Sequence, residues 1–415
     1  MTFSVAFALE RALQTLLPAR DIIEQRVDEA IEPAWCRTRG WGAFLLRMSE
    51  ADLERCEAEG LAQVAESLPG IPRDLSQLAA QVRAVTTLPA LEPAALGEAQ
   101  DFRGVSWRKR QQLSALLGAL APLVASAERI VDVGAGSGHF TRLSARHFSR
   151  EALGLERNPE RVASASARAE SAPAAPFNAQ YAVVDALQDG LALRAGDLAI
   201  GLHACGELGD TLVRAVASAG VDLGLVSCCL QKISTPQRAA LSLAARGLSL
   251  PKETLGLSNL TAQAIGVETS MEGMMQARQA RYALRQLLRA RGLEVEPGAE
   301  MSGINRRQAN AGLSEIAGRA LAQRGLSAAT ASEIAEHERQ AIAGYGAVRR
   351  LSLPRNLLAR SIELAVVLDR AAHLSEQGYG VVVATLFDRA VTPRNISLFA
   401  SRDASRLPTV RAPFS

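Results

Sequence analysis

The feature that most constrains this chain is an apolar strand that runs directly into a glycine-rich turn. Residues 130–140 read IVDVGAGSGHF, and a helix-compatible run, Thr141 to Phe148, follows. Glycines let the backbone approach a ligand closely, and the N-terminus of the next helix offers free N–H groups. The pattern therefore predicts a nucleotide-like ligand at the end of this strand.

Short apolar strands alternate with Ala-rich helices from Arg129 to Ile233. The predicted strands are Ile130–Val133, Ala152–Leu155, Tyr181–Val184, Leu198–Leu202 and Leu223–Val226. This alternation is typical of βαβ units and a buried parallel sheet. Two later apolar runs, Gly380–Leu386 and Ile396–Ala400, are expected to pair antiparallel and close the sheet. We predict an α/β, Rossmann-like fold with seven strands, five parallel plus the C-terminal pair.

Helical spacing dominates the rest of the chain. Apolar residues recur at helical intervals before residue 98 and again between 236 and 376. The later helices are expected at Met271–Ala290, Leu313–Arg324, Ala331–Ala343 and Asn356–Glu376. We expect an N-terminal helical region at 1–98, a ligand-binding domain at 99–235 and 377–415, and a helical insertion at 236–376.

Composition excludes several classes of protein. With 415 residues, 48% of them hydrophobic, the chain can bury a large core, and a net charge of +3 indicates no particular partner. The five cysteines lack paired secretory spacing, which suits reduced thiols in a cytoplasm. We see no signal peptide and no apolar run of about 20 residues, so we expect no membrane span. The oligomeric state is not apparent from the sequence.

Residues around the turn favour S-adenosylmethionine over a dinucleotide. Asp132 lies two residues before Gly134, where its carboxylate would face the ligand's ammonium group and would repel a pyrophosphate. A dinucleotide fingerprint also requires Gly or Ala three residues after its second glycine, and here His139 follows Gly136 at that interval. We therefore assign Asp132, Gly134, Gly136 and Gly138 to binding of this methyl donor.

Two further acids end the next two strands. Glu156 follows the turn by about 20 residues, where a carboxylate can accept both ribose hydroxyls. The alternative for Glu156 is an acid at the start of the helix that begins near Pro159. Asp185 ends the third strand, where it would meet the adenine amino group, although an ordinary turn aspartate is the alternative. Three acids at three successive strand ends indicate an S-adenosylmethionine site more specifically than any one of them does.

A cluster of reactive side chains follows the fourth and fifth strands. These candidate catalytic residues are His203, Cys205, Cys228, Cys229 and Lys232. Strand ends line the ligand crevice in such a sheet, so we expect them near the transferred methyl group. The histidine or lysine would orient or deprotonate the acceptor, or a cysteine would act as nucleophile. Zinc binding and simple packing of the cysteines are the alternatives; the spacing is not that of a standard zinc finger, and we assign no metal.

Two blocks of this region resemble a known family. Residues 201–208 (GLHACGEL) and 227–234 (SCCLQKIS) resemble the methyltransferase-like twenty-five family, also described as rRNA adenine dimethyltransferase domain-containing proteins. More distantly, they are similar to tRNA 2′-O-methyltransferases with a Cys-Cys motif. The resemblance implies a class I methyltransferase with Gly134, Gly136, Glu156 and Asp185 in the donor site. It implies that His203, Cys205, Cys228, Cys229 and Lys232 are signature residues. The chain departs from the family pattern at Leu230-Gln231 and at Gln111-Gln112.

The acceptor is the least constrained part of the prediction. From Ser270 to Arg360 the chain has 14 arginines and 8 acidic residues, and a basic helical insertion could hold a phosphate backbone. A solvated helical face is the alternative. The Asn/Asp-Pro-Pro-aromatic signature of DNA N6-methylation is absent, so we expect no DNA. We predict an S-adenosylmethionine-dependent methyltransferase acting on RNA; the alternatives are a non-catalytic binding scaffold and a protein or small-molecule methyltransferase.

Overall fold

The structure is a computed structural model that describes residues 4–93, 102, 105–170, 179–261, 271–296, 298–304, 311–392 and 394–411. The chain forms two compact units. The first comprises residues 1–20, 81–264 and 358–415, and the second comprises 21–80 and 265–357. These units divide the chain differently from the three regions expected above, whose boundaries at 98, 235 and 376 stay a prediction.

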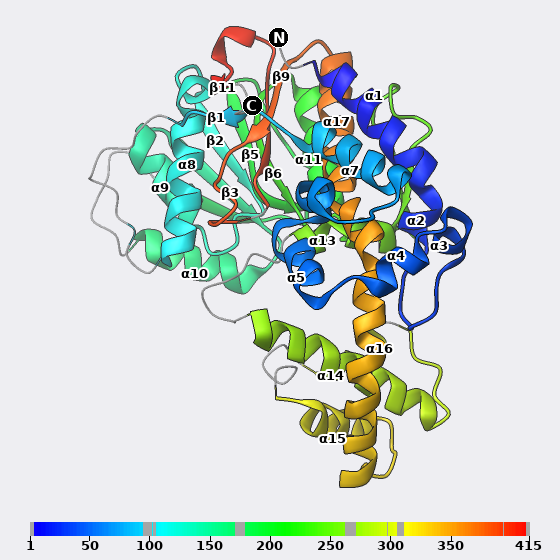
Figure 1. The fold of residues 1–415 in the computed structure, drawn as a ribbon. Coiled ribbons are helices and arrows are strands. Elements are labelled where there is room, and N and C mark those ends of the chain that lie inside the picture. The colour runs from blue at the N-terminus through cyan, green and yellow to red at the C-terminus, as the bar shows by residue number, and fades with distance from the viewer. Residues whose placement is uncertain are drawn as a thin grey trace. The chain divides into compact units, whose positions relative to one another are not determined.

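A nine-stranded sheet forms the centre of the first unit (Figure 1). Its spatial order is β11 (Val410–Arg411), β1 (Ala90–Leu91), β9 (Gly380–Thr385), β10 (Ile396–Ser401), β6 (Asp222–Cys228), β5 (Asp197–Cys205), β2 (Arg129–Val133), β3 (Glu151–Glu156) and β4 (Ala179–Val183). Strands β2 to β6 are parallel, and β10 runs antiparallel to both β6 and β9. The seven predicted strands are confirmed. The two additional strands, β1 and β11, are two-residue segments at one edge of the sheet.

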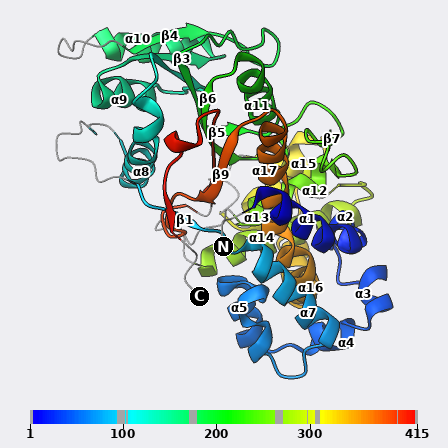
Figure 2. The same ribbon diagram turned by 90° about the horizontal axis from the view of Figure 1, so that it is seen from above.

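Helices cover both faces of this sheet (Figure 2). Side chains of a strand alternate between its faces. In β5, Leu198, Ile200 and Leu202 belong to the buried cluster shared with α8 (Trp107–Val124) and α9 (His139–Phe148). The intervening Gly201 faces the other way, because a Cβ there would lie 2.8 Å from Leu212 of α11 (Glu207–Ala219). The strand ends between these two helix layers carry the candidate site.

Further elements complete the first unit. Its other helices are α1 (Val5–Leu16), η1 (Leu17–Ala19), α10 (Pro159–Glu170), α12 (Lys252–Gly256), α13 (Ser258–Thr261), α17 (Ala359–Glu376) and η5 (Ala404–Arg406). Helix α17 contacts α1, α11, β9 and β10. A small antiparallel pair, β7 (Gln237–Ala239) and β8 (Ser249–Pro251), corrects the expectation that residue 236 begins an all-helical region. Three-residue strands carry too little periodicity to be recognised in a sequence.

The second unit is helical. Its elements are α3 (Ala34–Arg39), α4 (Gly42–Arg47), α5 (Glu50–Glu59), α6 (Leu61–Val64), η2 (Ala65–Ser67), α14 (Met271–Ala290), η3 (Ala299–Met301), α15 (Leu313–Gln323) and α16 (Ala331–Leu357). Two helices, α2 (Arg20–Glu24) and α7 (Arg73–Thr86), extend across the boundary between the units. Helix α16 contacts α14, α15 and α4 to α6. It continues through Pro354, so it is longer than the predicted Ala331–Ala343 segment.

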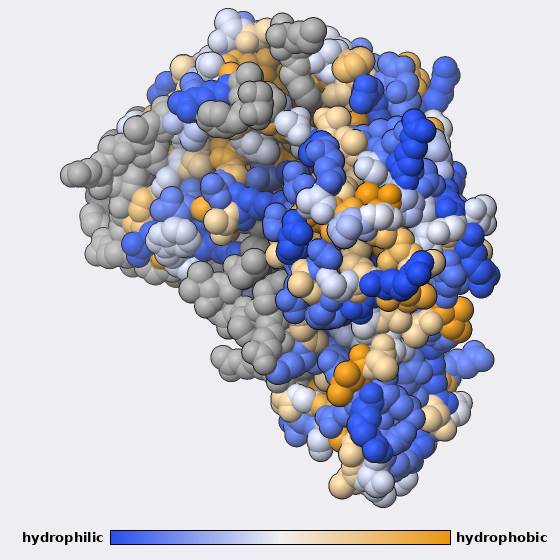
Figure 3. All heavy atoms as spheres, viewed as in Figure 1, coloured by the Kyte–Doolittle hydropathy of each residue, from blue (hydrophilic) through white to orange (hydrophobic). Residues whose placement is uncertain are grey.

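Hydrophilic residues occupy much of the described surface in Figure 3, with apolar patches between them. Large exposed apolar side chains include Phe7, Trp107 and Ile342. Within the described part of the chain, none of the helices combines the length and the apolar character needed to cross a membrane.

Candidate active site

Three glycines of the turn between β2 and α9 adopt left-handed backbone conformations. The φ angles are +77° at Gly134, +58° at Gly136 and +71° at Gly138. Other residue types rarely adopt this region, so the glycines are needed for the path of the chain. The N–H groups of Gly134 and Ala135 donate to the carbonyl oxygen of Leu155 at 2.8 and 3.0 Å. The turn is therefore fastened to the end of β3.

Glu156 holds the middle of the turn. Its carboxylate accepts hydrogen bonds from the N–H of Gly136 at 3.0 Å and from the N–H of Asn158 at 3.1 Å. The nearest atom to a Cβ built on Gly136 would be the Gly134 carbonyl oxygen, 3.9 Å away. The side of Gly136 without a side chain thus faces open space, which fits close approach of a ligand. The N-terminal N–H groups of α10 (Pro159–Glu170) are capped by Asn158 rather than by Glu156, and a donor-binding role for Glu156 stays a prediction.

Gly138 is constrained by a tyrosine that the sequence did not single out. A Cβ at Gly138 would lie 2.5 Å from Tyr181 Cε1. The Tyr181 hydroxyl donates to the Gly138 carbonyl oxygen at 2.9 Å, and burial raises the pKa of Tyr181 to about 12. Gly138 is therefore needed for packing between α9 and β4, in addition to its predicted place in the donor site. An aromatic residue within a strand gives no sign of this contact.

Asp132 lies beneath the turn in a buried position. Its side chain is 2% exposed and accepts a hydrogen bond from Thr141 Oγ1 at 2.6 Å. Burial raises the pKa of Asp132 to about 6, although the Thr141 bond and the positive charge of Lys109 act in the opposite direction. The structure thus gives Asp132 a partner in α9, which the sequence did not predict.

Asp185 follows the end of β4 and organises its own loop. Its carboxylate accepts the N–H of Leu187 at 3.1 Å, and its N–H donates to Asp189 at 3.0 Å. The side chain is half-buried. Asp132, Glu156 and Asp185 therefore lie at or beside the ends of β2, β3 and β4, neighbours in the sheet, as the strand pattern predicted.

His203 sits at a bulge in β5. The pairing with β6 shifts between Leu202 and Ala204, and His203 has a φ of +67°. The carbonyl oxygen of His203 accepts the thiols of Cys205 and Cys228, each at 3.2 Å. The His203 ring nitrogen Nε2 lies 3.1 Å from Gln112 Oε1 of α8. With this oxygen as acceptor, Nε2 carries the ring proton, and Nδ1 can accept a hydrogen bond. Such backbone strain is found preferentially at functional sites.

Burial also determines the charge of His203. It lowers the pKa of His203 to about 4, helped by the positive charges of Lys109 and Arg394. The ring is therefore neutral at neutral pH, and it suits hydrogen bonding to an acceptor better than proton abstraction, which favours a pKa near the working pH. Gln112 is a neighbour of His203 that the sequence showed only as a departure from the family pattern.

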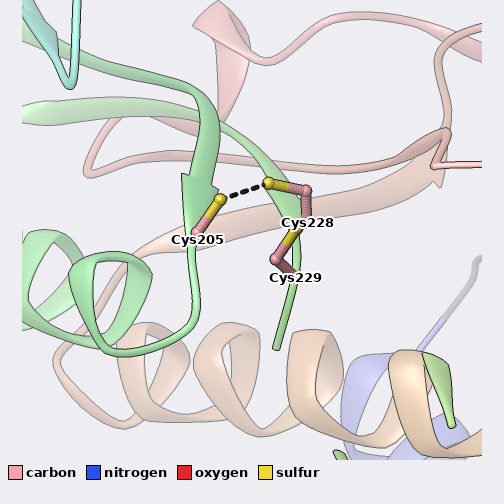
Figure 4. A group of neighbouring side chains, drawn as sticks. All are labelled: Cys205, Cys228 and Cys229. Atoms are coloured by element: carbon pink, nitrogen blue, oxygen red, sulfur yellow. Dashed lines mark hydrogen bonds between the residues drawn. The ribbon is translucent and has the colours of Figure 1, made fainter. Parts of the chain in front are cut away.

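Three cysteines meet at the ends of β5 and β6 (Figure 4). Cys205 and Cys228 are register partners on the two strands, with their sulfurs 2.7 Å apart, and all three sulfurs lie within 4.8 Å of one another. Interaction with Cys228 lowers the pKa of Cys229 to about 5, assisted by Arg394 and Lys232. The hydrogen bond with Cys205 is the main cause of the raised pKa of Cys228. All five cysteines are free thiols.

Lys232 belongs to the same loop, with an exposed side chain in electrostatic range of Cys205 and Cys229. Its N–H donates to the Cys229 carbonyl oxygen and its own carbonyl oxygen accepts the N–H of Glu207, both at 3.0 Å. A Cβ at Gly206 would lie 2.1 Å from that carbonyl oxygen. The loops after β5 and β6 are thus locked together, and the structure brings His203, Cys205, Cys228 and Cys229 into one cluster beside Lys232.

A buried charge network supports these loops from below. Arg370 of α17 is 0% exposed and donates to the Gly206 carbonyl oxygen at 2.7 Å, to Ser227 Oγ at 2.6 Å and to Asp210 at 2.8 Å. Arg238 bridges Asp210 and Asp369, each at 2.8 Å. Sequence reasoning missed this network, because its members come from distant parts of the chain.

Four arginines of the expected basic insertion make contacts within their own units. In the second unit Arg349 pairs with Glu50 and Glu57, and Arg350 bonds the Met48 carbonyl oxygen and Glu50. Arg355 bonds the Ile23 carbonyl oxygen, and in the first unit Arg360 pairs with Glu363. Residues 306 and 307, also arginines, lie outside the described residues. The RNA prediction therefore gains no support from a free arginine surface.

Part of the chain matches a known family model, and the chain is similar to several solved structures. Residues 108–236 match the family model described as "Methyltransferase domain". Among solved structures, the chain is similar to the sugar N-methyltransferase KedS8 from Streptoalloteichus (20% identity, 33% of this chain and 58% of that one, TM-score 0.23). It is similar to the amino pentose methyltransferase CalS10 from Micromonospora echinaspora (23% identity, 30% of this chain and 52% of that one, TM-score 0.24). It is also similar to the N-methyltransferase NodS from Bradyrhizobium japonicum (18% identity, 32% of this chain and 68% of that one, TM-score 0.24). The chain thus spans 52–68% of their lengths.

Residues 108–236 thus carry a methyltransferase domain, and they lie within the Rossmann-like α/β unit that holds the glycine-rich turn. The cofactor is S-adenosylmethionine, as the sequence predicted. The open side of Gly136 and the carboxylate of Glu156 fit that ligand.

Proposed function

We propose that this protein methylates RNA, using the turn at Gly134–Gly138 for the donor and the cluster after β5 and β6 for the acceptor. The observation that carries the proposal is the common edge of the sheet. Strands β2 and β5 are adjacent and parallel, so the donor turn after β2 and His203 near the end of β5 lie at the same edge of the sheet. Holding both reactants at one edge supplies the alignment on which methyl transfer depends.

Methyl transfer requires the protein mainly to orient the acceptor and to place charge near the donor. S-adenosylmethionine supplies a methyl group on a positively charged sulfur; its S–CH₃ bond breaks as the acceptor–CH₃ bond forms, and the acceptor's proton leaves to solvent. The neutral His203 offers Nδ1 to orient the acceptor by accepting its hydrogen. Gln112 holds the ring in place from α8. Asp132 and Glu156 add negative charge on the donor side.

Basic side chains favour a polyanionic acceptor. Lys109 and Arg394 are in electrostatic range of His203, and Lys232 is in range of Cys205. Only three of the 46 basic residues are lysines, and two of them, Lys109 and Lys232, lie here. The likeness of residues 201–208 and 227–234 to the methyltransferase-like twenty-five family points to the same class of acceptor.

Calorimetry tests the donor site. The wild-type protein should bind S-adenosylmethionine and not NAD. Gly136→Arg should weaken binding roughly 100-fold or more, because the new side chain enters the open side of the turn. Gly247→Arg is the matched control, since Gly247 is exposed, has ordinary backbone angles and has no neighbour within 4 Å of its Cβ position. Unchanged binding in Gly136→Arg would reject this donor site.

Labelling tests the acceptor. A lysate is incubated with the protein and tritiated-methyl S-adenosylmethionine, then divided between nuclease and protease digestion. Nuclease-sensitive label that is absent with Gly136→Arg supports RNA. Protease-sensitive label would replace RNA with a protein acceptor. Donor binding without any label would favour the non-catalytic scaffold.

A further inference from the structure

The three cysteines at the ends of β5 and β6 form an arrangement that exceeds what packing requires. Cys36 and Cys56 show the packing role in this chain, because each is buried, with 0% and 3% exposure, in a helix of the second unit. Cys205 and Cys229 are only half-buried. Within the described residues, these two and Cys228 are the one group of three or more metal-ligating side chains whose ligand atoms converge.

We propose that Cys205, Cys228 and Cys229 bind a Zn²⁺ ion through their three sulfurs. Zinc is bound by thiolates at about 2.3 Å in a tetrahedron, which places pairs of sulfurs about 3.8 Å apart. The sulfurs here lie within 4.8 Å of one another, and the closest pair is 2.7 Å apart. Binding therefore requires the closest pair to separate, and rotation about the Cα–Cβ bonds is the movement that would do this.

The backbone at this place is already held for such a site. Cys205 and Cys228 are register partners on adjacent parallel strands, and Cys229 follows with a φ of +26°. The Cys229 carbonyl oxygen is fixed by the N–H of Lys232, and Arg370 fixes Ser227 and Gly206 on either side. Rigid placement of the ligands and their supporting bonds is what a metal site requires.

The charges around the cluster favour the bound form. Binding is written as Zn²⁺ plus three thiols giving a zinc–trithiolate and three protons, so the complex carries a net charge of −1. Lys109, Lys232 and Arg394 are each in electrostatic range of at least one of these sulfurs and offset that charge. Three protein ligands leave a fourth position for water, as in catalytic zinc sites. The backbone carbonyl oxygen of His203 accepts hydrogen bonds from the Cys205 and Cys228 thiols, and the imidazole ring of His203 is not among the proposed ligands.

The test measures metal binding directly and does not depend on methyl transfer. The zinc proposal would therefore stand even if the proposed function failed. The full-length protein is stripped with a chelator under anaerobic, reducing conditions and titrated with Co²⁺ as a spectroscopic probe, then with Zn²⁺ against a chromophoric chelator. We expect one ion per chain and a thiolate-to-cobalt charge-transfer band. Cys205→Ser and Cys229→Ser should each lower the affinity roughly 100-fold or more. Cys56→Ala, which removes a thiol outside the cluster, should bind like the wild type.

A second measurement on the wild-type protein avoids dependence on the folding of the variants. Zinc should slow alkylation of Cys205, Cys228 and Cys229, as located by mass spectrometry, and a chelator should restore it. The absence of a charge-transfer band would overturn the proposal. So would full affinity in Cys229→Ser, or a Cys205–Cys228 disulfide in place of metal in protein isolated without reductant.

Discussion

Asp132 is an ionisable residue placed where water cannot reach it. Its folded-state pKa is about 6, above the ordinary value of 3.8, because burial outweighs the Thr141 bond and the charge of Lys109. A carboxyl whose pKa is raised by folding binds its proton more tightly in the folded state. Its contribution to the free energy of unfolding is therefore greatest below pH 4 and falls as the pH rises through about 6.

Replacing Asp132 by Asn should remove that pH dependence. The amide oxygen can still accept the Thr141 hydroxyl, but no charge forms in the buried site. We expect Asp132→Asn to be more stable than the wild type at pH 8, by about 3 kcal/mol at most, with the difference vanishing near pH 4. Urea unfolding between pH 4 and pH 8 measures this. Asp189→Asn, at an exposed aspartate, is the control, and parallel curves for Asp132→Asn and the wild type would contradict the expectation.

At this scale, sequence reasoning located residues better than it described their surroundings. It placed Glu156, His203 and the cysteines at strand ends, where the structure has them. It did not identify Gln112 as the partner of His203, because the two are 91 residues apart and meet only when α8 packs on the sheet. The pKa of a buried group depends on such packing, so it could not be derived from a motif.

Among the elements, α17 contributes the side chain that supports the candidate site from below. Its apolar side chains pack on the sheet, and Arg370 carries three hydrogen bonds to the loop after β5, to β6 and to α11. A buried guanidinium is costly unless it is fully paired, and removing one partner of a buried ion pair leaves the other uncompensated. Asp210 depends on Arg370 together with Arg238.

Arg370→Met should therefore destabilise the first unit by about 3–5 kcal/mol. Arg370→Lys should recover part of that loss, since it restores a charge but cannot make all three bonds. Urea unfolding followed by circular dichroism measures the change. Arg319→Ala, at an exposed pair with Glu315 in α15, should change stability by under about 0.5 kcal/mol. Equal effects of Arg370→Met and Arg319→Ala would show that the network contributes nothing.

The elements themselves were predictable where they are long and periodic. All seven predicted strands are present, and α14 has the predicted bounds Met271–Ala290. The two-residue strands β1 and β11 depend on pairing across the chain, which no local pattern indicates. Proline usually ends a helix, yet α16 passes through Pro354 and ends only at Leu357, next to the start of α17.

For the whole molecule, the distribution of charge was the least predictable property. An excess of arginine over acids in residues 270–360 suggests a basic surface, but Arg349 pairs with acids nearly 300 residues earlier in the chain. The same unit pairs Arg285 with Asp28, Arg289 with Glu29, and Arg291 with Glu333. The acids that neutralise the insertion belong partly to residues 21–80, so counting within one stretch overestimates the field that an RNA would meet.

Because many arginines of the second unit are paired with acids, we expect only a weak dependence of RNA binding on salt. If the polyanion is held by Lys109, Lys232 and Arg394, the logarithm of affinity for single-stranded RNA should fall with the logarithm of salt concentration with a slope of about −2, because each neutralised phosphate contributes about −0.7. In the double variant Lys109→Gln/Lys232→Gln the slope should shrink to about −0.7. Lys252→Gln, at the one remaining lysine, should leave it unchanged.

Fluorescence anisotropy with a labelled RNA oligonucleotide, over a range of salt concentrations and with S-adenosylmethionine present, gives these slopes. A slope far steeper than −2 that persists in the double variant would place the phosphate contacts on other basic residues. A slope near −2 that falls only when Lys109 and Lys232 are replaced would locate the acceptor beside the thiol cluster, where transfer of the methyl group requires it to be.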